Sequence, residues 1–135
     1  MTAPGPSFPR LPRPTSLSAP FWAAAARHQL VIQRCRDDGR YEWTPQQACS
    51  RCLRETLEWT PASGRGTVYS FSVVTRPAVP GLAVPYIVAI VELAEGPRML
   101  TRLRGLDPHD ARIGLPVRVA FEDADELALY LFEPA

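Results

Sequence analysis

The feature that most constrains this chain is a cysteine-rich stretch from Cys35 to Cys52, which holds all three of its cysteines. Cys49 and Cys52 form a C-x-x-C motif, whereas the first half of the stretch reads C-x-x-D. Asp38 therefore stands where a second cysteine would complete a four-thiolate site. Paired knuckles of this spacing are typical of structural zinc sites, and aspartate can also ligate zinc. The stretch predicts a zinc site formed by Cys35, Asp38, Cys49 and Cys52.

Two other interpretations of this stretch are open at the level of sequence. Packing of Leu57 and the tryptophans Trp43 and Trp59 could hold the loops, with three idle thiols. A disulfide between Cys49 and Cys52 is an alternative in oxidised protein. The chain shows no basic start followed by an apolar core, and no apolar run near the ~20 residues that span a bilayer. We therefore expect a cytoplasmic protein, and clustered cysteines there are more often metal ligands than disulfides.

The residues around the cysteines predict three short strands. Leu30–Arg34 leads into the first knuckle, Trp43 and Thr44 begin the return, and Leu57–Trp59 follows the second knuckle. Gly39 sits where a knuckle needs a tight turn with positive φ. This alternation of strands and knuckles is the order of a zinc ribbon.

A short helix is expected before the ribbon, over residues 19–28, because four successive alanines have high helix propensity. Ser18 is suited to cap it, and proline is tolerated in its first turn. Phe21 and Trp22 lie on one side and face either the core or a partner. Residues 1–17, with five prolines, are expected to be extended. They form either a disordered tail or an arm on a partner, anchored by Phe8 and Leu11.

The remainder of the chain, residues 63–135, predicts a β-barrel. Alternating segments rich in β-formers are separated by proline and glycine. The expected strands cover residues 66–74, 86–93, 99–103, 116–121 and 126–132, with a helical turn at 107–111. Five strands with that turn between the third and fourth are the plan of an OB-fold. The chain is thus expected to be mainly β: a tail (1–17), a helix with a zinc-ribbon module (18–62) and a five-stranded OB-fold barrel (63–135).

Charge and motifs narrow the function. The formal net charge is only +1, which gives no electrostatic argument for nucleic acid or membrane. Single-stranded nucleic acid is kept as an alternative, since Tyr69 and Phe71 are expected on one strand face and arginines on another. The only histidines are His28 and His109, and no nucleophile elbow, phosphate loop or dinucleotide fingerprint is present. Catalysis by the chain alone is not expected.

The order of these parts resembles a bacterial and archaeal family in which a rubredoxin-like zinc ribbon precedes an OB-fold. The resemblance covers about residues 20 to 132. The segments that carry it are Phe21–Trp22, Leu30–Cys35, Cys49–Cys52, Gly64–Val74 and Arg112–Val119.

The resemblance implies a non-catalytic accessory subunit of a thiolase-like enzyme, an aldolase or thiolase acting on acyl-CoA thioesters, as in steroid or lipid side-chain degradation. Other members accompany acyl-CoA hydratases or polyketide acyltransferases. It implies a hetero-oligomer in which the chain helps to form the acyl-CoA site. The expected partner-binding residues are Phe21, Trp22, Val79, Leu82 and Val84, and the expected contacts for CoA phosphates are Arg98, Arg102, Arg104 and Arg118.

Overall fold

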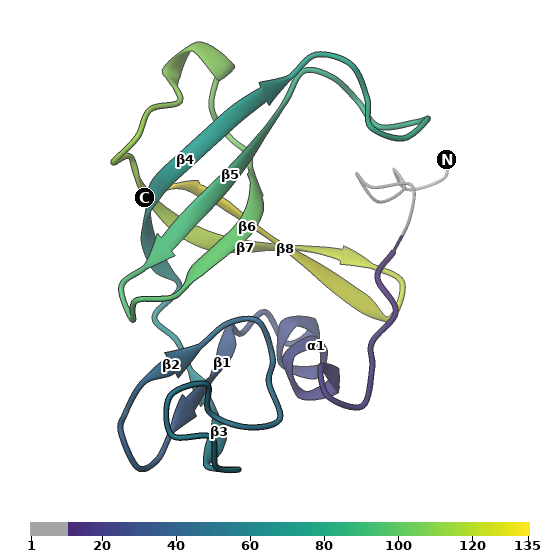
Figure 1. The fold of residues 1–135 in the computed structure, drawn as a ribbon. Helices are drawn as coiled ribbons and strands as arrows, with labels where there is room; N and C mark the ends of the chain where they lie inside the picture. Colours follow the sequence, from purple (N-terminus) through teal and green to yellow (C-terminus); the bar gives the residue numbers. More distant parts are fainter. Residues whose placement is uncertain (1–10) are drawn as a thin grey trace.

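The computed structural model describes residues 11–135, which form one short helix, a small sheet and a closed barrel (Figure 1). The predictions for residues 1–10, including the anchoring role of Phe8, lie outside the described residues. The elements in order are α1 (Ala19–Ala26), β1 (Val31–Cys35), β2 (Tyr41–Glu42), β3 (Leu57–Pro61), β4 (Arg65–Val74), β5 (Tyr86–Leu93), β6 (Arg98–Leu103), the 3-10 turn η1 (Pro108–Asp110), β7 (Pro116–Ala124) and β8 (Leu127–Pro134). The predicted mainly β fold, with helix, ribbon and five-stranded OB barrel, is confirmed.

Helix α1 forms as predicted, but Ser18 does not cap it. The Ser18 side chain makes no capping hydrogen bond to the helix. Its hydroxyl instead accepts from the Thr15 amide at 2.9 Å and lies 3.1 Å from the Thr15 hydroxyl. Ser18 therefore stands at the N-cap position as predicted, but its hydroxyl closes the preceding turn with Thr15 and does not cap the helix.

The ribbon is a three-stranded antiparallel sheet in the order β2-β1-β3. Strand β1 lies in the middle, with Gln33 opposite Glu42 on one side and Trp59 on the other. The return strand covers Tyr41 and Glu42, so the prediction that it begins at Trp43 was two residues late. Trp43 lies beyond the strand, and its ring packs against Phe21, with ring centroids 4.8 Å apart.

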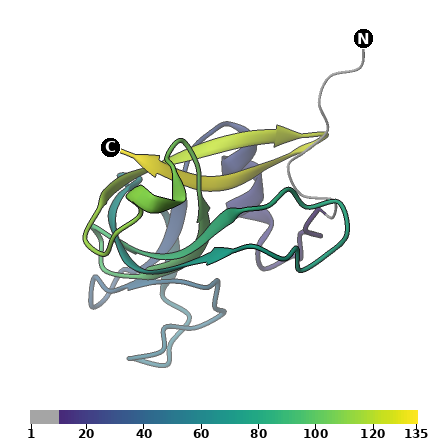
Figure 2. The same cartoon turned by 90° about the horizontal axis from the view of Figure 1, so that it is seen from above.

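The barrel closes in the order β4-β5-β6-β8-β7, and η1 lies between β6 and β7 along the chain. At Gly66, an added Cβ would lie 2.5 Å from the Glu92 carbonyl oxygen, so the close approach of β4 to β5 requires glycine. The β4–β5 and β7–β8 hairpins both extend to one side of the barrel (Figures 1 and 2). The β7–β8 hairpin reaches over α1 and joins the barrel to the ribbon module.

A β-bulge in β4 overturns one expectation. The register with β5 shifts between Val68 and Ser70, which places Tyr69 outside the alternation. Tyr69 is 46% exposed and lies under the Arg98 guanidinium, 3.8 Å from the ring centroid, whereas Phe71 packs against the core. The two aromatic rings therefore do not share one face, and they do not form the stacking surface expected for nucleic-acid binding.

One continuous core joins the three parts of the chain. The buried side chains of this cluster include Phe21 from α1, Ile32 from β1 and Phe132 from β8. Phe21 is 1% exposed and contacts Trp22, Trp43 and Tyr130, with ring centroids 5.0, 4.8 and 5.5 Å away. The aromatic cluster therefore fixes the helix and ribbon against the barrel.

A second connection forms where α1 ends. His28 has φ 59, and the Gln29 and His28 amides bond back to the Ala24 and Ala25 carbonyls, the pattern of a Schellman ending in which glycine is preferred. The His28 ring stacks on Phe121 with centroids 5.4 Å apart, and its Nε2 lies 2.8 Å from Asp123 Oδ1. These contacts to the β7–β8 hairpin offset the cost of the left-handed backbone.

We expect His28→Gly to be more stable than His28→Ala, although alanine has a higher helix propensity than glycine. Both variants lose the contacts to the hairpin, but only glycine relieves the positive φ, which is worth about 1 kcal/mol. Urea unfolding of the two variants measures this difference. At Arg27, with φ −95, the order should reverse, so that Arg27→Ala is the more stable of that pair. Equal stability of the two His28 variants would contradict the backbone argument.

Candidate metal centre

The first knuckle closes immediately after β1. The Cys35 amide donates to the Arg40 carbonyl, and the Cys35 carbonyl accepts from the Gly39 amide, both at 2.8 Å. Gly39 has φ 74, as the sequence predicted for a tight turn. This turn brings the side chain of Asp38 back towards the sulfur of Cys35.

The second knuckle repeats this backbone pattern. The Cys49 amide donates to the Arg54 carbonyl at 2.9 Å, and the Cys49 carbonyl accepts from the Leu53 amide at 2.8 Å. Leu53 has φ 61 and thus takes the place of Gly39. Because the two loops are equivalent, Asp38 occupies in the first knuckle the position that Cys52 occupies in the second. The backbone therefore places Asp38 where a fourth ligand would lie.

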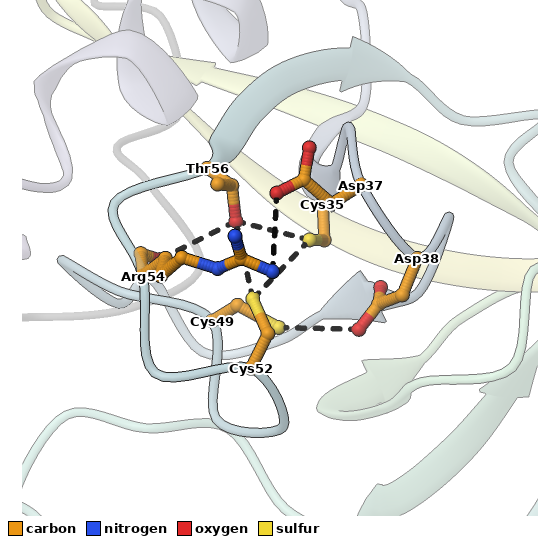
Figure 3. A network of polar contacts seen from close by, with 7 residues as sticks. All are labelled: Cys35, Asp37, Asp38, Cys49, Cys52, Arg54 and Thr56. Carbon is orange, nitrogen blue, oxygen red and sulfur yellow. Dashed lines mark hydrogen bonds and ion pairs between the residues drawn. The ribbon is translucent and has the colours of Figure 1, made fainter.

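The four side chains converge on one point (Figure 3). Their ligand atoms lie within 4.8 Å of one another. The sulfurs of Cys35 and Cys52 are 3.8 Å apart, and Cys49 Sγ is 3.6 Å from Asp38 Oδ2. With Zn–S and Zn–O bonds of about 2.3 and 2.1 Å, a tetrahedral centre separates two sulfurs by ~3.8 Å and a sulfur from an oxygen by ~3.6 Å. The arrangement fits a tetrahedral zinc ion with one carboxylate and three thiolate ligands.

Asp38 is held in place although its side chain is exposed. Its Oδ1 accepts from the Arg40 amide at 2.8 Å, which leaves Oδ2 facing the cysteines. This backbone hydrogen bond is the main cause that lowers the pKa of Asp38. The carboxylate is therefore ionised and oriented before a cation arrives, as a metal ligand must be.

The thiols differ in their readiness to ionise. The Thr56 hydroxyl and the Arg54 backbone amide lower the pKa of Cys52 to about 7. For Cys49 the Cys52 backbone amide also lowers the pKa, but burial and the neighbouring thiols outweigh it, so that the pKa is raised. Because thiolates rather than thiols bind zinc, Cys52 is the sulfur best prepared for metal at neutral pH. All three cysteines are free of disulfides.

Two buried polar side chains fix the loop that leads to the second knuckle. Gln33 bonds to both the amide and the carbonyl of Gln46, at 2.7 and 2.8 Å. The Glu42 carboxylate accepts from the Ser50 amide at 3.0 Å and from the Ser50 hydroxyl. Sequence reasoning missed Gln33 and Glu42. In the sequence, each is a polar residue inside a strand that flanks the cysteines. Only the pairing of these strands shows that both side chains are buried against the loop.

The residues predicted to bind a partner fall into two groups. Phe21 and Leu82 are 1% and 6% exposed and pack within this chain. Trp22 and Val79 are half-buried, and Val84 is 41% exposed. Of the five residues predicted to contact a partner, only Trp22, Val79 and Val84 are therefore accessible on the surface.

The four arginines predicted for CoA all engage carboxylates. The Glu133 carboxylate accepts hydrogen bonds from Nε of both Arg104 and Arg118, at 3.0 and 3.2 Å. These two arginines lower the pKa of Glu133. Arg98 pairs with Glu92 at 3.1 Å, and Arg102 lies 3.6 Å from Glu122. A phosphate would have to share or displace these carboxylates.

A cavity of about 270 Å³ brings two of these arginines together. Arg102 and Arg104 line it with the apolar residues Pro85 and Leu106 and the ring of Tyr86. Sites that enclose a whole ligand typically measure about 300–1,000 Å³. This cavity can therefore receive part of a large ligand but cannot enclose an acyl-CoA.

Fold and site together define a zinc-ribbon protein with a C-terminal OB-fold. Residues 22–58 match the rubredoxin-like zinc ribbon domain of ChsH2, and residues 59–122 match the C-terminal OB-fold domain of ChsH2. The chain belongs to the ChsH2 family of zinc-ribbon and OB-fold proteins, as the resemblance in the sequence had indicated.

Individual relatives agree with this assignment. The 3-oxo-4,17-pregnadiene-20-carboxyl-CoA hydratase alpha subunit of Mycobacterium tuberculosis is 44% identical over 124 residues, which are 90% of this chain and 40% of that protein. The benzoylsuccinyl-CoA thiolase subunit BbsA of Geobacter metallireducens is 40% identical over 72 residues, 53% of this chain and 48% of that protein. This chain thus spans less than half the length of either relative.

A solved structure is similar over nearly the whole chain. A chain of the Ltp2-ChsH2(DUF35) aldolase matches with a TM-score of 0.84 and 38% identity, over 92% of this chain and 98% of that one.

No helix in the described part of the chain has the length and apolar character needed to cross a membrane.

Proposed function

We propose that this chain is a non-catalytic accessory subunit of a thiolase-like enzyme, an aldolase or thiolase that acts on acyl-CoA thioesters in steroid or lipid side-chain degradation. The observation that carries the proposal is the match to the aldolase chain, which extends over ribbon and barrel together. The name of the thiolase subunit BbsA supports the same class of partner. The proposed setting is the cytoplasm.

The site chemistry is consistent with a supporting role. In residues 11–135 the cysteines meet an aspartate and no histidine, and such a cluster suits a structural metal. The His28–Asp123 pair stacks on Phe121, where it connects two elements. The catalytic nucleophile and base are accordingly assigned to the partner.

The acyl-CoA site is proposed to be shared. The cavity beside Arg102 and Arg104 is too small for the whole ligand, so a partner surface must complete it. A hydratase partner is a second candidate, because the hydratase alpha subunit of Mycobacterium tuberculosis is 44% identical to this chain. The two candidates share the thioester substrate class and differ in the reaction that the catalytic subunit performs.

Co-purification of this chain with its partners from the native host tests the proposal, and the exposed loop between β4 and β5 gives a variant for it. We expect Val84→Asp to reduce recovery of a thiolase-like partner by about tenfold or more, because a buried charge at an interface costs well over 1.4 kcal/mol. Ile113→Asp is the matched control, since Ile113 is 71% exposed and the next residue, Gly114, bonds to the Val68 carbonyl in the first half of β4, at the opposite end of that strand from the β4–β5 loop. Equal recovery with both variants would remove Val84 from the interface, and a partner of unrelated fold would contradict the proposed function.

A further inference from the structure

Thr56 is a buried hydroxyl that lies at the junction of the two knuckles, yet it is outside the predicted ligand set. The residue is 4% exposed and immediately precedes β3. Its Oγ1 is 3.0 Å from Cys35 Sγ in the first knuckle and 3.4 Å from Cys52 Sγ in the second. Figure 3 shows the hydroxyl directed at the sulfurs from the side opposite Asp38.

The backbone of Thr56 also connects the two knuckles. Its carbonyl accepts from the Arg36 amide of the first knuckle at 2.9 Å, and its amide donates to the Arg54 carbonyl of the second at 2.8 Å. Both loops therefore fix the backbone of Thr56 beside the sulfurs, and the contacts of the hydroxyl itself orient the side chain. A group held in this way is preorganised towards the sulfurs.

The number of hydrogens decides what the hydroxyl does once metal is bound. A threonine hydroxyl has one hydrogen to donate, and three acceptors lie within reach: the two sulfurs and the Arg54 carbonyl, 3.3 Å away. A metal-bound thiolate has lost its proton and can only accept. The Arg54 carbonyl already accepts from the amides of Cys49 and Thr56. The hydroxyl hydrogen therefore goes to a sulfur. In the metal-free chain the contact with Cys52 favours the thiolate of that residue, but once both sulfurs are metal-bound thiolates the hydrogen goes to the nearer one, Cys35.

We infer that Thr56 is a positioning residue of the zinc centre, whose hydroxyl donates a hydrogen bond to the Cys35 thiolate and sets both the affinity and the electron donation of that ligand. The inference rests on the zinc site described above and adds a group that does not touch the metal. Outer-shell hydrogen bonds of this kind change metal affinity by about 10–100-fold.

Two substitutions separate the hydroxyl from the shape of the side chain. Thr56→Val keeps the volume and removes the donor, whereas Thr56→Ser keeps the donor and removes a methyl group. We expect Thr56→Val to weaken zinc binding, measured by competition with a chelator, by about 10–100-fold, and Thr56→Ser to stay within about threefold of wild type. Thr60→Val is the matched control, because the Thr60 hydroxyl on β3 bonds to the Glu58 carbonyl at 3.1 Å.

A spectroscopic measurement excludes a role in packing alone. In the Co²⁺-substituted protein, Thr56→Val should shift the sulfur-to-cobalt charge-transfer bands to lower energy, since a thiolate without a hydrogen bond is a better electron donor, and Thr56→Ser should not. Unchanged affinity and bands in Thr56→Val, or a loss in Thr56→Ser as large as in Thr56→Val, would overturn the inference. A wild-type chain that binds neither Co²⁺ nor Zn²⁺ would overturn the zinc site together with it.

Discussion

Replacing Cys49 with serine is expected to lower the zinc content from about one ion per chain to near zero and to unfold the ribbon. Cys49 is fully buried, and its knuckle brings both itself and Cys52 to the cluster. The serine hydroxyl stays protonated at neutral pH and is a poor zinc ligand. The loss in affinity should exceed the ~10–100-fold typical of outer-shell changes.

The consequence for folding is large because the ribbon has few other means of support. Its sheet has three short strands, one of them with only two residues. Structural zinc contributes about 10–16 kcal/mol of binding free energy in small zinc-binding peptides, and this becomes folding free energy when no site exists in the unfolded chain. Loss of zinc should therefore melt β1–β3 while the barrel keeps its strand signal in circular dichroism.

A substitution at Asp38 provides the matched control. Asp38→Cys replaces the carboxylate with a fourth thiolate, and we expect zinc to be retained at least as tightly, because thiolate is the softer ligand. Asp38→Ala should weaken zinc binding, since it leaves three ligands. Zinc analysis of the purified proteins by mass spectrometry gives the ratios. A wild-type ratio near zero without chelator treatment would contradict the metal centre and favour a ribbon held by packing of Trp43 and Trp59.

Phe21→Ala is expected to destabilise the chain by about 3–5 kcal/mol. Phe21 is almost fully buried and contacts aromatic rings from the helix, the ribbon and the barrel. Its removal leaves a cavity where these three parts meet. We therefore expect unfolding of the wild type in urea to be a single transition and that of Phe21→Ala to separate into a ribbon step and a barrel step.

Tryptophan fluorescence is a direct probe for this prediction, because Trp22 and Trp43 both lie against the Phe21 ring. Ile113→Ala is the control, since Ile113 is 71% exposed and its truncation should change the free energy of unfolding by no more than about 0.5 kcal/mol. A loss below about 1 kcal/mol in Phe21→Ala would mean that the aromatic cluster does not hold the parts together.

The ribbon and the convergence of its four candidate ligands could be predicted from the sequence because their determinants are local. A knuckle places residues three apart beside each other, so the spacing alone predicts that Cys35 pairs with Asp38 and Cys49 with Cys52. Barrel strands were readable from alternation, and β5 was predicted with its observed bounds. Alternation fails where the backbone inserts a residue, which is why Tyr69 and Phe71 were wrongly placed on one face.

The groups that support the site could not be predicted in the same way. Thr56, Gln33 and Glu42 act through contacts that cross between loops, and nothing in their spacing distinguishes them from ordinary polar residues. Ser18 fits the statistics of an N-cap, but a competing contact with Thr15 takes its hydroxyl. Such choices are decided by tertiary neighbours, which only the structure supplies.

The most direct test of the accessory role is the turnover of an acyl-CoA thioester by three samples: this chain, a thiolase-like protein that co-purifies with it and is then purified separately, and their stoichiometric mixture. Carbon–carbon bond cleavage can be followed by chromatography of the CoA products. We predict no turnover by this chain and at least about tenfold more by the mixture than by the partner alone, because the chain completes the substrate site. Turnover by this chain alone, or equal activity of partner and mixture, would contradict the account.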